Sequence, residues 1–156
     1  MEGFTVALAL MDGVPVAFFA AAMVLTALRF GSALFAAGAA VITLASCCKV
    51  LWKLILGIWK KNVAWLNRLF IPAQLSGLVL VLLSAAMDLR GIAWKALCTA
   101  LTGFPSAVFF LCWLAGMGLM GWYRKNKFDN SARANWTAQL VNTAAQGALL
   151  LGVLFA

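Results

Sequence analysis

Five long apolar stretches constrain the fold of this chain more than any other feature. They extend over residues 4–28, 32–56, 69–87, 92–122 and 131–155. An α-helix needs about 20 mostly apolar residues to cross the hydrocarbon core of a bilayer. The sequence therefore predicts an all-α, polytopic transmembrane bundle of about five spanning helices, formed by residues 1–156 as a single domain.

The composition favours a membrane protein over a soluble one. Hydrophobic residues make up 65% of the 156 residues and charged residues only 10%, whereas soluble globular domains have about 45–50% and about 25%. A soluble core of this size cannot bury so much apolar surface, so lipid must surround much of the chain. The same composition excludes a disordered chain.

Positive charge is concentrated in two of the connections between the apolar stretches. The net charge is +8, and most basic residues lie in two segments that include these connections and the adjoining ends of the stretches: Lys49, Lys53, Lys60, Lys61 and Arg68 at the second connection, and Arg124, Lys125, Lys127 and Arg133 at the fourth. The positive-inside bias and anionic lipid headgroups account for such segments, so we expect the lipid bilayer and no nucleic acid as partner. Connections rich in basic residues alternate with connections that have few, so we expect a cytoplasmic N-terminus and an external C-terminus. We expect the protein to reside in the plasma (inner) membrane.

A short sequence similarity links the first and fourth stretches. Residues 13–19 have the sequence GVPVAFF, and residues 103–110 have GFPSAVFF. Helices one and two would then correspond to helices four and five, in opposite orientations, with helix three between them. Chance similarity among common membrane residues and an inverted 2+1+2 repeat both explain the match.

The fifth stretch carries the strongest functional signal, a stripe of four carboxamides. They are spaced four, three and four residues apart and fall within about 60° of arc on one helix face: Asn135, Gln139, Asn142 and Gln146. Hydrocarbon cannot satisfy amide hydrogen bonds, so we expect the stripe to point toward helices one and four or a cavity between them. It either bonds to neighbouring helices or subunits or lines a site for a polar solute.

Ionisable residues near one membrane side form a second candidate constellation. Asp12 lies in the first stretch, and Lys49 and Lys53 lie four residues apart, on one face, in the second. A carboxylate in a span is costly unless it is paired or protonated, so we expect Asp12 to contact a basic side chain. Two simpler alternatives remain: the lysines extend to the headgroups, and Asp12 caps a helix that begins near Pro15.

Pro15 and Pro105 are expected to kink the first and fourth helices. Each lies about a dozen residues into its stretch, with a glycine two residues earlier. Such kinks either ease packing or expose backbone groups to a substrate.

Catalytic chemistry has little support in this sequence. There is no histidine, and the four cysteines form no CxxC pair, so we expect no metal site and can assign no cofactor. Asp88 and Asp129 fall in predicted loops on opposite membrane sides. An enzyme is therefore the least favoured class.

The sequence as a whole predicts a small membrane protein that binds or transports a small polar or amphipathic solute. The site residues would be Asn135, Gln139, Asn142, Gln146, Asp12, Lys49, Lys53, Pro15 and Pro105. The main alternative is a non-transporting membrane subunit, in which the amide stripe is an assembly interface with a copy of itself or with a partner subunit. A membrane-embedded enzyme is the second alternative.

Overall fold

The computed structural model describes residues 6–87, 94–126 and 131–156, and no strand occurs in these ranges. The helices are α1 (Val6–Phe30), α2 (Ala33–Trp59), α3 (Ala64–Arg68), α4 (Phe70–Met87), α5 (Trp94–Thr102), α6 (Ser106–Asn126) and α7 (Ala132–Phe155). Five helical segments are long and apolar enough to cross a membrane. The prediction of an all-α bundle with five spanning helices is confirmed, and the fold is that of an integral membrane protein.

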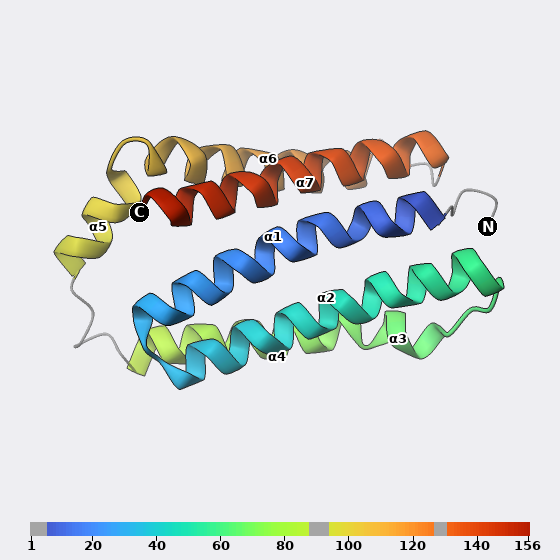
Figure 1. Cartoon of the computed structure of the whole chain (residues 1–156), viewed down its shortest axis with the longest axis horizontal. Coiled ribbons are helices and arrows are strands. Elements are labelled where there is room, and N and C mark those ends of the chain that lie inside the picture. Colours follow the sequence, from blue (N-terminus) through green and yellow to red (C-terminus); the bar gives the residue numbers. More distant parts are fainter. Residues whose placement is uncertain (1–5, 88–93, 127–130) are drawn as a thin grey trace.

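The five long helices form a row in the packing order α4, α2, α1, α7, α6 (Figure 1). α1 begins, α2 and α6 end, and α7 begins at the same end of the bundle (Figure 1). We call this the basic end, because the residues around these helix termini include Lys60, Lys61, Arg124, Lys125 and Arg133. α7 ends at the opposite end, as an odd number of crossings requires.

Short polar signals set the turns between the helices. Gly31 has a φ of 62° and its N–H donates to the carbonyl of Ala27, which ends α1 in the left-handed conformation that glycine favours. The Ser32 hydroxyl then accepts a bond from the N–H of Phe35 and caps α2. Ser131 caps α7 in the same way through the N–H of Ala134. These turns fold neighbouring helices back on each other.

The third and fourth spans differ from the sequence prediction. The third span begins earlier than expected and includes α3, so it covers residues 64–87. Residues 92–122 do not form one helix: the chain breaks between α5 and α6, and the fourth span is Ser106–Asn126. Proline disfavours helical conformation in the residue before it. At this break Ser106 is buried, and its hydroxyl contacts the carbonyl oxygens of Ala100 and Gly103 at 2.5 and 2.8 Å.

Small residues bring the backbones of α2 and α4 into contact. A Cβ added to Gly38 would lie 2.7 Å from the carbonyl oxygen of Gly77, and one added to Gly77 would lie 2.8 Å from that of Gly38. Gly116 meets Ala145 of α7 similarly closely, whereas Gly118 and Gly121 have open space beside them. Among the three glycines of α6, only Gly116 therefore lies at a close helix contact.

The helix directions agree with an inverted repeat, but the packing is not symmetric. α1 and α6 run in opposite directions, as do α2 and α7 (Figure 1). A twofold relation would match the packing of α1 on α7 with packing of α6 on α2, yet only the first is extensive among the described residues. Pro15 lies inside α1, whereas Pro105 lies before α6.

The outer surface of the bundle is apolar. Leucines on all the long helices are more than half exposed, including Leu10, Leu44, Leu82, Leu111 and Leu140. A soluble monomer rarely shows such a continuous apolar surface. Lipid is therefore the expected surroundings of these side chains.

Candidate solute-binding cavity

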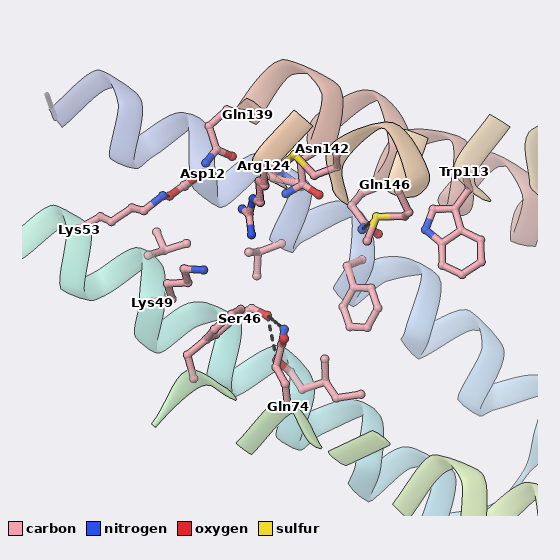
Figure 2. A pocket seen from close by; sticks show the side chains of 18 residues that line it. Asp12, Ser46, Lys49, Lys53, Gln74, Trp113, Arg124, Gln139, Asn142 and Gln146 are labelled. Atoms are coloured by element: carbon pink, nitrogen blue, oxygen red, sulfur yellow. Dashed lines mark hydrogen bonds and ion pairs between the residues drawn. The ribbon is translucent and has the colours of Figure 1, made fainter. Parts of the chain in front are cut away.

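A cavity of about 340 Å³ lies inside the half of the bundle near the basic end. Small-molecule sites usually have volumes of about 300–1,000 Å³. The lining side chains come from α1, α2, α4, α6 and α7 (Figure 2): Asp12, Pro15, Val16, Phe19, Ile42, Ser46, Lys49, Val50, Lys53, Phe70, Gln74, Trp113, Met117, Met120, Arg124, Gln139, Asn142 and Gln146. The two helices at the ends of the row, α4 and α6, thus face one common space.

Three of the four carboxamides on α7 line this cavity. Gln139 is only 5% exposed, and Asn142 and Gln146 continue the lining along the helix (Figure 2). Asn135 is buried too, but it lies outside the lining and donates to the carbonyl oxygen of Ser131. The expectation of an inward stripe is confirmed, and the cavity begins one turn after Asn135.

Several polar atoms at the cavity are buried without a hydrogen-bond partner. These are Oε1 of Gln139, Oε1 of Gln146 and Nε1 of Trp113. The amide nitrogen of Gln146 has only the sulfur of Met117, at 3.6 Å. A buried polar atom without a partner costs about 1–3 kcal/mol, and buried polar groups usually find a partner. Water or a bound solute would satisfy these atoms at once.

Asp12 and Lys53 form an ion pair at one side of the cavity (Figure 2). Both side chains are 9% exposed. The expectation that Asp12 contacts a basic side chain is confirmed. The alternative that Asp12 caps its helix is wrong, because α1 already begins at Val6 and Asp12 lies within it. Lys53 does not extend to the headgroups, since it turns inward to the carboxylate.

Lys49 and Arg124 add two further positive charges. The Nζ of Lys49 lies 3.8 Å from the centroid of the Phe70 ring, a cation–π contact. Arg124, in the last turn of α6, is exposed and also lines the cavity. Asp12 is the only acidic side chain in the described ranges, and it is paired with Lys53. The cavity therefore has an excess of positive charge.

A hydrogen bond between α2 and α4 forms the opposite wall. Nε2 of Gln74 donates to the hydroxyl of Ser46 at 3.4 Å (Figure 2). The Ser46 hydroxyl also contacts the carbonyl oxygen of Ile42 at 3.0 Å. These residues place polar atoms at the contact between α2 and α4 beside the cavity.

The two prolines have different positions. Pro15 is buried in α1 and lines the cavity, where its missing N–H leaves the carbonyl of Met11 without its helical partner. Pro105 does not belong to the lining residues, because it precedes α6 at the end of the bundle opposite the basic end. The expected kink inside the fourth helix is therefore wrong.

Sequence reasoning missed several lining residues that have a recognisable pattern. On α6, Trp113, Met117, Met120 and Arg124 are spaced four, three and four, like the amide stripe of α7. Arg124 had been assigned to a basic connection only. Ser46 lies three residues before Lys49 and so shares its face. The one sequence signal that could have indicated Gln74 is that it is a single carboxamide in an apolar stretch.

Some predicted features fall outside the described residues. They are Asp88, Lys127 and Asp129. Comparisons with protein-family models, curated proteins and solved structures find no match for this chain.

The chemistry of the cavity follows from its own residues. Charged and amide groups suit the polar part of a ligand, and the aromatic and apolar groups beside them suit an apolar part.

Proposed function

We propose that this membrane protein binds or transports a small polar or amphipathic solute, with the binding site in the cavity beside α7. One observation carries the proposal: Gln139, itself 5% exposed, has a side-chain oxygen without a partner at the cavity. Interhelical bonding would use such an oxygen, whereas a solute site leaves it available until the solute arrives. The amides of Asn142 and Gln146 lie beside it and extend the same surface.

The internal position of the stripe favours this function over a role in assembly. An interface between subunits would need the carboxamides on the outer surface of the bundle. Asn135 and Gln139 are instead among the buried polar residues. Asn142 and Gln146 line the cavity between the helices.

We also propose that the basic end faces the cytoplasm of the plasma (inner) membrane. The basic residues around the ends of α2 and α6 support this orientation through the positive-inside bias. The cavity would then be reached from the cytoplasmic side. Labelling of single cysteines placed near the start of α1 and the end of α7, from each side of the membrane, tests this: reaction of both from one side contradicts it.

The test of solute binding compares two amides of the same stripe. A ligand stabilises the folded protein that binds it, so unfolding temperatures are measured with a panel of small polar and amphipathic compounds for wild type, Gln139→Leu and Asn135→Leu. We expect a compound that stabilises wild type and Asn135→Leu but not Gln139→Leu. If Gln139→Leu instead unfolds more easily and keeps wild-type binding, the amides are structural and the proposal fails.

A further inference from the structure

We propose that the solute is an anion, and that a carboxylate or phosphate group binds between Lys49 of α2 and Arg124 of α6. This inference rests on the proposed function and adds the chemical class of the ligand. It follows from the charges of the cavity and from the way that the two side chains enter it.

The first argument is the charge balance. Three cationic side chains and one carboxylate line the cavity, an excess of two positive charges. The carboxylate of Asp12 is bound to Lys53. Lys49 contacts the face of the Phe70 ring, which does not neutralise its charge, and the ion pair among the described residues involves neither Lys49 nor Arg124. Charges at membrane depth usually pair with one another or mark the path of a ligand.

The second argument is geometric. Figure 2 shows Lys49 and Arg124 pointing from opposite helices toward the middle of the cavity, while Asp12 and Lys53 lie together at its edge. An oxyanion between them would accept hydrogen bonds from the Lys49 ammonium and the Arg124 guanidinium, which suit carboxylate and phosphate oxygens. The Lys53–Asp12 pair need not open for this contact.

The third argument concerns the rest of the ligand. Farther from the basic end, the lining changes to Phe19 and Trp113, beside Gln146. Trp113 has an unpartnered N–H, and Gln146 an unpartnered oxygen. The site therefore fits an amphipathic anion. Its charged group would lie near the basic end, and its apolar or hydroxylated part would lie beside Phe19, Trp113 and Gln146. A soluble organic anion and the phosphate of an anionic lipid share this chemistry.

The experiment is calorimetric titration of the full chain in a neutral detergent. The probes are 3-phenylpropionate and phenyl phosphate, with 3-phenylpropanol as the neutral analogue. The variants are Lys49→Gln and Arg124→Gln, and the control is Lys125→Gln, which removes an exposed cation next to Arg124 that does not line the cavity. The unfolding temperature of each variant is measured first to establish that it is folded.

We expect both anions to bind wild type and Lys125→Gln, and to bind Lys49→Gln and Arg124→Gln at least tenfold more weakly. 3-Phenylpropanol should bind more weakly to wild type and be insensitive to all three changes. If the alcohol binds as tightly as the anions and the charge variants bind them normally, the inference is overturned while solute binding stands. If no anionic or neutral probe binds, and no compound of the panel raises the unfolding temperature of wild type, the proposed function fails as well.

A lipid arm separates the two sources of the anion. Wild type is placed in nanodiscs of phosphatidylcholine, with or without phosphatidylglycerol, and retained lipid is identified by native mass spectrometry. A lipid headgroup in the site predicts that phosphatidylglycerol blocks phenyl phosphate and is retained by wild type but lost from both charge variants. A soluble anion predicts unchanged phenyl phosphate binding in both discs. Retention of phosphatidylglycerol by both charge variants, together with unaltered probe binding, contradicts an anion site at Lys49 and Arg124.

Discussion

The two halves of this bundle use the same helices in opposite ways. Toward the basic end the helices stand around a charged cavity. Toward the other end, which we call the closed half, Ala22, Leu149 and Val153 form an apolar core against Phe110 and neighbouring side chains. The difference lies in the residues of α1 and α7: small and aliphatic groups pack together in the closed half, whereas Asp12 and three carboxamides occupy the equivalent face near the basic end.

Two hydrogen bonds join helices at the far end of the closed half. In the closed half Arg29 donates to the carbonyl oxygen of Val153 at 2.7 Å, and the hydroxyls of Ser32 and Ser84 lie 2.7 Å apart. These contacts join α1 to α7 and α2 to α4 at the end opposite the basic end. These hydrogen bonds add to the apolar packing that holds the closed half together.

The largest expected effect comes from breaking the ion pair in the basic half. Asp12→Leu leaves Lys53 charged and buried without its carboxylate, and loss of one member of a buried pair costs about 3–5 kcal/mol. Reversible unfolding in mixed detergent measures the loss. The double variant with Asp12→Leu and Lys53→Leu should recover most of it, because two apolar side chains can replace a buried pair. A double variant as unstable as the single one contradicts the pairing.

The next effect concerns the close packing of α2 and α4 at Gly77. A Cβ there meets the Gly38 carbonyl oxygen and the Ile42 backbone nitrogen at 2.8 and 3.1 Å, and backbone atoms cannot move aside without separating α2 from α4. We expect Gly77→Ala to lower the free energy of unfolding by about 1–3 kcal/mol. Gly118→Ala is the control, because nothing lies within 4 Å of its added carbon. Equal stability of the two variants would mean that α2 and α4 are farther apart than described.

A smaller effect is expected at the seal of the closed half. Arg29→Met keeps an apolar stem but removes the hydrogen bond to the Val153 carbonyl, a net loss of about 1 kcal/mol. The same unfolding assay applies. Solute binding in the basic half should be unchanged, and a large loss of binding would mean that the two halves are coupled.

The smallest effect on stability is expected inside the cavity. Gln139→Leu removes an oxygen that has no partner, so the free energy of unfolding should change by about 0.5 kcal/mol or less, or rise slightly. Its effect on solute binding should be large. A destabilisation of about 2 kcal/mol would instead show that Gln139 bonds to a neighbouring helix.

Much of the architecture was predictable because lipid imposes simple rules. The length of the apolar stretches predicted five spans, and the spacing of the carboxamides predicted an inward face on α7. The pairing of Asp12 followed from the cost of a lone carboxylate. These inferences need only local sequence and the dielectric properties of the membrane.

The remaining features depend on contacts between distant segments. The local sequence did not indicate whether Asp12 would pair with Lys53 or with Lys49, because both lysines share one helix face. The break at Pro105 was hidden by continuous apolar composition from residue 92 to residue 122. From the sequence, Arg124 belongs to a basic connection between helices. Its place in the cavity depends on where the last turn of α6 lies relative to α2, which the local sequence does not determine.

The central claim, a water-accessible site at the basic end and a dry closed half, is tested most directly on α7 itself. In a background without the four native cysteines, Asn142→Cys and Leu149→Cys are exposed to a small membrane-impermeant methanethiosulfonate in sealed vesicles. Asn142 lines the cavity, and Leu149 is 5% exposed in the core of the closed half. We predict rapid modification of the cysteine at 142 from the basic side only and none at 149 from either side; no modification at 142, or equal modification at both positions, would contradict the account.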